Sequence, residues 1–229
     1  MIFERTIQLI GEENLNILQN STVLVLGIGG VGGHATDALA RGGIGTLILV
    51  DEDVVEPSNI NRQLVALHST IGLPKVDVMK QRILDINPDC NVITYHTFFD
   101  NSNLDTIFGH DIDFVLDCID TITYKIVAIK ESLKREIKII SSMGAGNKFH
   151  PERLEIAMLS KTTHDPIARI IRIQLRRSRV IGDIPVVFST ESQQKVDSHV
   201  LKPSSNSYVP SSFGIAMASH VINTLIGIE

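Results

Sequence analysis

A glycine-rich turn between an apolar strand and a helix constrains this chain more than any other feature of its sequence. Residues 22–26 are a short apolar run typical of a buried parallel strand, and Gly27, Gly29 and Gly32 follow it with GxGxxG spacing. Glycine permits a tight turn and lets backbone N–H groups approach an anion, and the following helix adds partial positive charge. Asp51 ends the next apolar strand, where a carboxylate can bind ribose hydroxyls. The pattern predicts a nucleotide site and fits NAD as well as ATP; a tight turn without a ligand is the alternative.

Strands and helices alternate through the first 146 residues. Apolar or β-branched runs predict strands, and helical patterns between them predict helices. The alternation predicts a doubly wound, Rossmann-like, mostly parallel α/β sheet, followed by a C-terminal extension of strands and helices. We expect strands at 22–26, 46–50, 91–97, 112–118, 137–142, 154–159 and 184–189, helices at 31–41, 74–86, from 118 to about 135, 165–179 and 211–226, and a polar, mobile loop at 192–208.

Composition narrows the class of protein. The chain has 229 residues, 43% hydrophobic residues and a net charge of −5, which is ordinary for a folded domain and argues against broad nucleic-acid binding. Its two cysteines, Cys90 and Cys118, form no CxxC pair, so no structural zinc site is expected. No secretory signal or membrane-length apolar run is present, so we expect a cytoplasmic protein without a membrane partner.

The segment after Asp51 carries side chains suited to phosphate chemistry. Transfer of AMP builds charge on phosphates, so cations must already be in place. Arg62 can fork onto phosphate oxygens, and Lys75 can act as a point charge. Asp120, after the strand at 112–118, is suited to hold Mg²⁺ on the β- and γ-phosphates. A dehydrogenase, which needs a nicotinamide pocket, has no use for this series.

Each of these side chains has a simpler explanation when taken alone. An arginine such as Arg62 is commonly solvated, Lys75 is placed like a surface residue near a helix start, and Asp120 is placed like a helix cap. Their joint occurrence in this order, behind a glycine turn, favours ATP chemistry.

The stretch from Gly27 to Asp120 resembles the superfamily of ubiquitin-activating-enzyme-like adenylating proteins, which includes the adenylyltransferases of thiamine and molybdopterin synthesis. The resemblance implies that the turn and the acid matching Asp51 hold ATP, that an aspartate matching Asp120 serves Mg²⁺, and that an arginine near the N-terminus is donated across a homodimer. Phe3-Glu-Arg5 looks like that last motif. The implied cofactor-binding residues are Gly27, Gly29, Gly30, Gly32, Asp51, Asp53, Asn59, Arg62, Lys75 and Asp120, and the implied catalytic residues are Arg62, Lys75, Asp120 and Arg5.

The second half is most similar to the tRNA threonylcarbamoyladenosine dehydratases. That similarity implies ATP-dependent adenylation of the threonyl carboxylate of threonylcarbamoyladenosine in tRNA, then intramolecular cyclisation with release of AMP. Intramolecular attack needs no protein nucleophile. The matching pieces are Gly144-Ala-Gly146 with His150-Pro151, Leu159-Ser-Lys161-Thr with Asp165-Pro166, Val187-Phe-Ser-Thr-Glu191, and Val209-Pro-Ser-Ser-Phe-Gly214. We expect one adenylating domain at 1–229, made of an N-terminal helical segment (1–21), an ATP-binding core (22–146) and a substrate-binding and C-terminal part (147–229).

A basic cluster in the second half fits a tRNA partner. Arg169, Arg172 and Arg176 share one face of the expected helix at 165–179, and arginine suits phosphate contact. The alternative is a solvated amphipathic face whose isoleucines pack inward. The candidate nucleic-acid-binding residues are Lys161, Arg169, Arg172, Arg176, Arg177 and Arg179.

Two other functions stay open. An adenylyltransferase for the C-terminal glycine of a ubiquitin-like sulfur-carrier protein would use the same phosphate chemistry, with sulfur-transfer proteins as partners. The missing zinc cysteines and the arginine-rich helix count against it. A non-enzymatic nucleotide sensor would not need the whole set Asn59, Arg62, Lys75 and Asp120. Cys118, inside an expected core strand, is interpreted as a structural thiol rather than a nucleophile.

Overall fold

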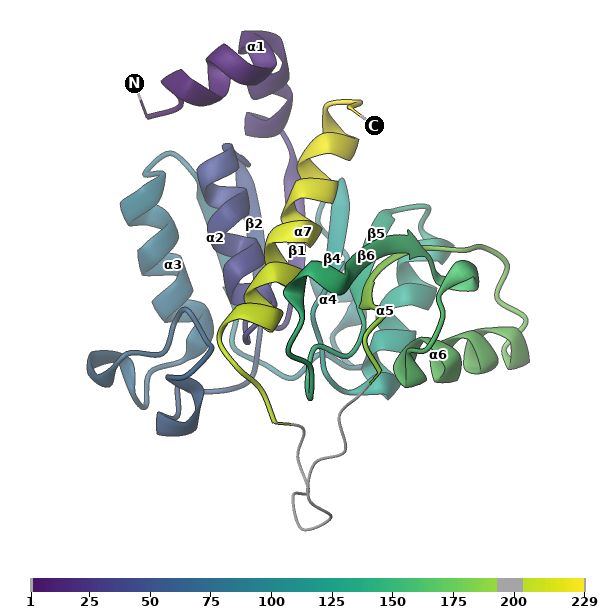
Figure 1. Ribbon diagram of the computed structural model, residues 1–229. Helices are drawn as coiled ribbons and strands as arrows, with labels where there is room; N and C mark the ends of the chain where they lie inside the picture. The colour runs from purple at the N-terminus through teal and green to yellow at the C-terminus, as the bar shows by residue number, and fades with distance from the viewer. Residues whose placement is uncertain (1, 193–203, 229) are drawn as a thin grey trace.

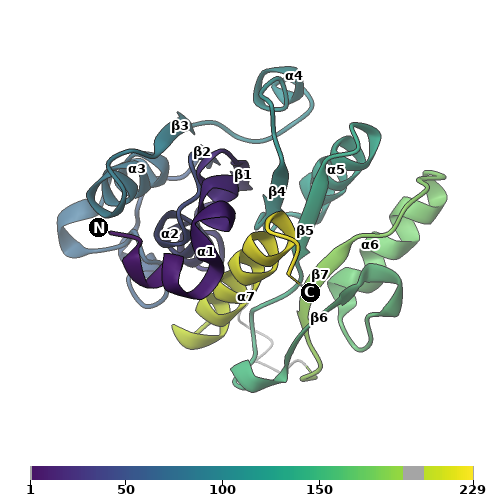
Figure 2. The ribbon, with the colours of Figure 1, turned by 90° about the horizontal axis from the view of Figure 1, so that it is seen from above.

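A computed structural model describes residues 2–192 and 204–228, and its centre is one seven-stranded sheet in the order β3-β2-β1-β4-β5-β7-β6 (Figures 1 and 2). All neighbouring strands are parallel except β6 and β7, which pair antiparallel. The strands are β1 (Thr22–Leu26), β2 (Thr46–Val50), β3 (Asn91–Tyr95), β4 (Phe114–Asp117), β5 (Lys138–Ser142), β6 (Leu154–Met158) and β7 (Pro185–Ser189). The strand order reverses at β1, so a crevice is expected beyond the carboxyl ends of β1 and β4.

Helices cover both faces of the sheet. The helices are α1 (Glu4–Gln19), α2 (Gly32–Gly42), α3 (Lys75–Ile86), α4 (Leu104–Ile107), α5 (Ile122–Lys134), α6 (Pro166–Arg177) and α7 (Tyr208–Leu225). Seen from above, α1, α2, α3 and α7 lie on one side of the sheet, and α5 and α6 lie on the other (Figure 2). No helix in the described residues combines the length and the apolarity that spanning a bilayer requires.

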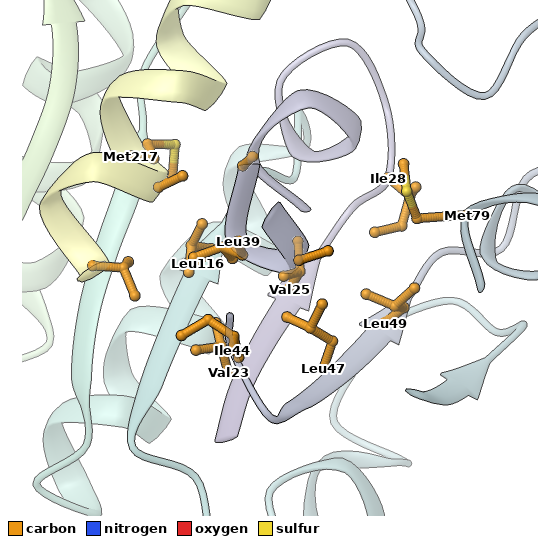
Figure 3. Packing of buried hydrophobic residues seen from close by; sticks show 14 of the residues in the cluster. Val23, Val25, Ile28, Leu39, Ile44, Leu47, Leu49, Met79, Leu116 and Met217 are labelled. Carbon is orange, nitrogen blue, oxygen red and sulfur yellow. The ribbon is translucent and has the colours of Figure 1, made fainter. Parts of the chain in front are cut away.

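The strand periodicity explains the two cores. Along β1, Val23 and Val25 face the α2 and α7 side, and Leu24 and Leu26 face the α5 side, because successive strand residues alternate between faces. Figure 3 shows the first of these clusters, in which Val25 packs among side chains from β2, α2 and α7. Since the central strands are buried on both faces, they read as continuous apolar runs.

The expected element types are confirmed and several boundaries move. Strands β3 and β4 are shorter than the expected 91–97 and 112–118. Helix α7 begins at Tyr208 rather than 211, because the Asn206 side chain accepts the Val209 N–H and Pro210 suits a first helical turn. The expected polar loop at 192–208 therefore ends sooner, and its residues 193–203 lie outside the described residues. The short helix α4 was not expected from the sequence.

Candidate nucleotide-binding site

The turn after β1 is built so closely that two of its glycines cannot be replaced. Gly27 has a φ of +90°, and a Cβ there would lie 2.9 Å from the carbonyl oxygen of Cys118 at the end of β4. A Cβ on Gly32 would lie 1.8 Å from the carbonyl oxygen of Gly27. The turn is thus folded tightly on itself and pressed against the neighbouring strand end, at the place where the strand order reverses.

The outer part of the same turn offers free hydrogen-bond donors. The backbone N–H groups of Gly29, Gly30 and Val31 donate to no acceptor among residues 2–192 and 204–228. Helix α2 begins at Gly32, so its positive N-terminal end adds to these amides. Free amides at a helix N-terminus form an anion site of the kind that binds phosphate.

Asp51 is fixed by the turn at the end of β2. Its Oδ2 accepts the Ile28 N–H at 2.6 Å, and its Oδ1 accepts the Asp53 N–H at 2.9 Å. Burial raises the pKa of Asp51, and the nearby Lys75 and these two amides partly offset that rise. Each carboxylate oxygen keeps a lone pair for a ribose hydroxyl. The structure therefore puts Asp51 where the sequence pattern required it.

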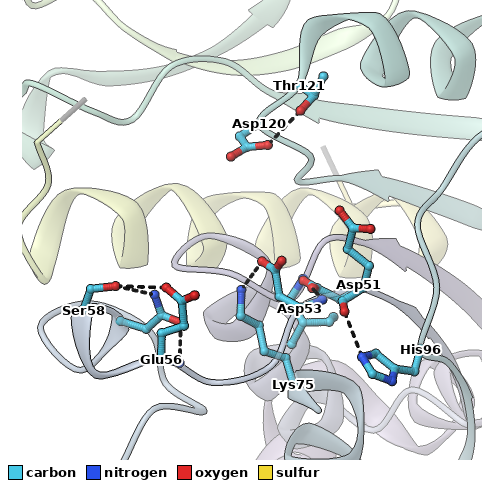
Figure 4. Close-up of polar contacts among 11 residues, drawn as sticks. Asp51, Asp53, Glu56, Ser58, Lys75, His96, Asp120 and Thr121 are labelled. Carbon is cyan, nitrogen blue, oxygen red and sulfur yellow. Dashed lines mark hydrogen bonds and ion pairs between the residues drawn. The ribbon is translucent and has the colours of Figure 1, made fainter. Parts of the chain in front are cut away.

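Lys75 and Asp53 form an ion pair beside Asp51. The Nζ of Lys75 lies 2.6 Å from the Oδ2 of Asp53, and the lysine side chain is only 5% exposed. Lys75 also interacts electrostatically with Asp51, so one ammonium faces two carboxylates. Figure 4 shows this group with His96, whose ring contacts the Glu52 carbonyl oxygen at 2.8 Å. Lys75 is the first residue of α3 and is buried, not a solvated surface lysine.

Arg62 lies against the glycine turn. A Cβ on Gly30 would come within 3.6 Å of the Arg62 Cγ, and the guanidinium donates to the Ser58 carbonyl and to Asn61 Oδ1, both at 2.9 Å. Asn59 is buried, and its side chain accepts the Glu56 N–H at 3.1 Å. Asn59 therefore shapes the segment that carries Arg62.

Gln63 belongs to this site and was not selected from the sequence. It is buried, its Nε2 would lie 3.8 Å from a Cβ on Gly29, and its Oε1 has no hydrogen-bond partner in the described part of the chain. A buried unpaired acceptor is costly, so a hydroxyl or amino group of a bound molecule is a fitting partner. The only signal in the sequence was its place directly after Arg62.

Asp120 lies on the other side of the turn. It is exposed, and its described side-chain bond is to the Thr121 hydroxyl at 3.2 Å. It follows Cys118 by two residues, and Cys118 itself packs against Gly27. Figure 4 shows Asp120 apart from Asp53 and Lys75. The carboxylate is thus free to bind a cation that also contacts an anion on the turn.

Arg62, Lys75 and Asp120 flank the turn, and no hydrogen bond or ion pair in the described part of the chain joins any two of these three side chains. Arg62 is held by its neighbours, Lys75 is paired with Asp53, and Asp120 stands apart. A polyanion on the free amides would lie between two cations and an acid. That arrangement suits transfer of a phosphoryl or nucleotidyl group.

Arg5 does not join the site of its own chain. It lies in the first turn of α1, next to Phe3, whose ring would come within 3.5 Å of a Cβ on Gly43. Gly43 caps the far end of α2, an 11-residue helix that starts at Gly32, so about 16 Å of helix separates Arg5 from the turn.

The candidate nucleic-acid residues divide into two groups. Arg172 donates to the carbonyl oxygens of Leu159 and Thr162, at 3.1 and 3.2 Å, and to the Thr162 hydroxyl. Three bonds from Nη1 therefore tie the guanidinium to the fold, which counts against a main role of Arg172 in phosphate binding. The other members are exposed: Lys161, Arg169, Arg176, Arg177 and Arg179.

The Cys118 thiol is not suited to nucleophilic attack. Burial and the neighbouring Asp117 raise its pKa to about 12, so the thiol stays protonated near neutral pH. Its sulfur lies 3.9 Å from the Met217 sulfur on α7. The interpretation of Cys118 as a packing residue agrees with this environment.

The fold and the site define a nucleotide-binding protein of the ThiF family: the ThiF family model matches residues 3–229, and the chain belongs to that family. The tRNA threonylcarbamoyladenosine dehydratase of Bacillus subtilis (strain 168) is 47% identical, over 98% of this chain and 94% of the relative. A crystal structure of the Escherichia coli tRNA N6-threonylcarbamoyladenosine dehydratase in complex with ATP superposes with a TM-score of 0.93 and 32% identity, over 98% of this chain and 93% of that chain. These comparisons confirm the family resemblance and the fold expected from the sequence.

Proposed function

We propose that this protein is an ATP-dependent tRNA threonylcarbamoyladenosine dehydratase. The observation that carries the proposal is a likeness to such enzymes that extends over 98% of the chain and therefore includes the second half. The yeast adenylyltransferase and sulfurtransferase relatives, in contrast, match only 62–65% of it. We treat residues 1–229 as one adenylating domain, since β6 and β7 complete the same sheet as β1–β5.

The proposed reaction has two steps. A threonyl carboxylate oxygen bonds to the α-phosphorus of ATP and pyrophosphate leaves. An atom of the adjacent carbamoyl group then attacks the acyl carbon and AMP leaves, so one water is lost overall. Because the second attack is intramolecular, positioning replaces a protein nucleophile. A Cys118 thiol with a pKa of about 12 is consistent with that mechanism.

The described residues have distinct roles in the first step. The free amides of the turn bind phosphate, and Asp51 binds the ribose. Arg62 and Lys75 stabilise the charge that develops on the phosphates, which requires Lys75 to exchange its Asp53 partner for a phosphate oxygen. Both described bonds of Arg62 come from Nη1, so its Nε and Nη2 can donate to phosphate oxygens.

Asp120 is suited to be the one carboxylate ligand of a magnesium ion at this site. Mg²⁺ in phosphate sites uses one or two carboxylates together with waters and the substrate's own phosphates. Asp120 is exposed and its second oxygen is uncommitted among the described residues. When bound, Mg²⁺ would neutralise charge on the β- and γ-phosphates.

A homodimer would bring Arg5 to the site. Arg5 lies at the end of α2 opposite its own glycine turn, so only another subunit can supply it. Subunit mixing tests this: dimers of Arg5→Ala with Arg62→Ala should regain activity at about one site in four, because half of the dimers are mixed and each holds one intact site. No regained activity would contradict delivery across the interface.

The decisive experiment measures the nucleoside. Purified protein, ATP and Mg²⁺ are incubated with tRNA that carries threonylcarbamoyladenosine, and nucleosides are analysed by mass spectrometry. We expect a loss of about 18 Da from the modified adenosine, because ring closure removes one water. Pyrophosphate release triggered by a ubiquitin-like carrier protein, and not by tRNA, would instead favour the sulfur-carrier adenylyltransferase. A tRNA substrate also supports a location in the cytoplasm.

A further inference from the structure

Three polar side chains form a fully buried cluster at the carboxyl ends of β4 and β5. Lys125 on α5 is 1% exposed, Asp117 on β4 is 0% exposed, and Ser141 on β5 is 0% exposed. The Nζ of Lys125 lies 3.0 Å from Asp117 Oδ2, and the Ser141 hydroxyl donates to the same oxygen at 2.5 Å. The reaction proposed above assigns no role to any of them.

The cluster occupies positions of the sheet where the burial pattern predicts apolar side chains. Asp117 and Ser141 are direct partners in the β4–β5 ladder, on the face where Val115 and Ile139 continue the α5-side core. Replacing a buried ion pair with apolar residues of similar size is often neutral or stabilising. Lys125 also lies in the first turns of α5, where the helix dipole disfavours a cation. Stability therefore does not explain these three residues.

Their contacts lead directly to Asp120. Asp117 Oδ1 accepts the Ile119 N–H at 3.1 Å, and Lys125 Nζ lies 3.5 Å from the Asp117 carbonyl oxygen. The turn from β4 into α5 is thus tied down just before the exposed carboxylate. Asp120 itself has little else to hold it, since its described side-chain bond is to the adjacent Thr121.

We propose that Lys125, Asp117 and Ser141 are positioning residues that hold Asp120 at the geometry needed for magnesium-dependent binding of ATP. The cluster acts through the Ile119 amide and the Asp117 carbonyl, and it touches no substrate. This inference rests on the metal role proposed for Asp120. It adds that a polar network beneath the crevice, and not the carboxylate alone, sets the affinity for the metal.

The test uses two double variants that differ in one respect. Asp117→Leu with Lys125→Met removes the ion pair and the acceptor for Ile119. Asp117→Asn with Lys125→Met removes the charges but keeps an acceptor. The readout is the rise in unfolding temperature caused by ATP, measured in a metal chelator and again over a Mg²⁺ titration. Ile129→Val, a buried change on the same helix, is the control for lost packing.

We expect the leucine variant to keep the metal-independent shift and to need about tenfold more Mg²⁺ for half of the metal-dependent shift, the usual scale for outer partners of a metal ligand. The asparagine variant should stay within about threefold of wild type, and Ile129→Val should match wild type. A leucine variant that also matches wild type would overturn the proposal, as would equal losses in both double variants.

Ser141→Ala tests the same role of the cluster if the variant with Asp117→Leu and Lys125→Met does not fold. It removes one hydroxyl donor to Asp117, so the half-saturating Mg²⁺ concentration should rise about threefold, the effect of one modest hydrogen bond. An unchanged value in this variant contradicts the proposal. Since this readout uses ATP and Mg²⁺ without tRNA, a failure of the dehydratase reaction would leave the result on Asp120 positioning intact.

Discussion

Two regions are rich in charge but are held by different means: the nucleotide crevice, meaning the surroundings of the turn at Gly27–Gly32, and the α6 surface, meaning the exposed arginines of α6. In the crevice, Asp51 accepts two backbone amides and Lys75 is a buried ammonium with a carboxylate at 2.6 Å. On α6, Arg169, Arg176 and Arg177 are long exposed side chains. A fixed charge acts at one distance and orientation, whereas a solvated one acts mainly through the field of the whole surface. The first region is suited to chemistry and the second to holding a large anion.

The largest effect should come from the glycine that allows the crevice to form. Gly32→Ala places a methyl group 1.8 Å from the Gly27 carbonyl oxygen, so the turn must open. We expect loss of measurable ATP binding by calorimetry and a loss of about 2–4 kcal/mol in the free energy of unfolding.

Gly11→Ala is the matched control for this change. Gly11 has a positive φ, +84°, which Gly32 does not have, and a Cβ on Gly11 meets no atom within 4 Å. The substitution should cost about 1–3 kcal/mol of stability through backbone strain, since the ψ of Gly11 is 163°, and leave ATP affinity unchanged. If Gly32→Ala bound ATP normally, the turn would not be the phosphate site.

The next effect concerns a cation of the crevice. Arg62→Ala removes charge stabilisation from the phosphates, and we expect a drop of about 10²–10³-fold in kcat for pyrophosphate release. Its unfolding free energy should change by less than about 0.5 kcal/mol beyond that of Arg41→Ala, an exposed arginine on α2 with a local partner. Unaltered kcat in Arg62→Ala would remove this residue from the catalytic set.

The backbone geometry of the glycine turn could be predicted from the sequence, because backbone constraints leave a local pattern in it. Gly27, Gly32 and Asp51 are each required by local geometry at a fixed spacing, and a strand–turn–helix pattern reports that geometry directly. The sheet could be predicted for a similar reason, because continuous apolar runs in the sequence mark buried parallel strands.

Contacts between distant segments were not predictable in this way. Arg172 looked like its neighbours on α6, because its acceptors at Leu159 and Thr162 come from a separate turn. Lys125 looked like any helical lysine until β4 and β5 were placed beneath it. Side chains that serve the fold or the site through tertiary contact carry no local signature of that role.

The α6 surface gives a third, smaller test. Combined Arg169→Ala, Arg176→Ala and Arg177→Ala should weaken tRNA binding and lower the slope of log affinity against log salt by about 1 for each lost phosphate contact. Binding of ATP alone should not change. Equal salt slopes in variant and wild type would show that tRNA binds to another surface of the protein.

Arg172→Ala separates the structural arginine from the exposed ones. Loss of the guanidinium leaves the Leu159 and Thr162 carbonyls without this donor. We therefore expect the free energy of unfolding, measured by denaturant titration, to fall by about 1–3 kcal/mol. The salt slope of tRNA binding should stay at the wild-type value. A changed slope with unchanged stability would mean that its guanidinium binds phosphate after all.

The smallest effect should come from the one thiol beside the crevice. Burial and the neighbouring Asp117 raise the pKa of Cys118 to about 12, so the thiol stays protonated at pH 8 and is a poor nucleophile that reacts slowly with iodoacetamide. Cys118→Ala should leave kcat for product formation within about twofold of wild type, and folded protein should resist alkylation at this site that urea-unfolded protein undergoes. A loss of more than about tenfold in kcat without a matching loss in stability would point to a covalent step. Because Cys118 directly follows β4 and packs against Gly27, its substitution also shows whether the turn depends on the chemistry of its neighbours or only on their shape.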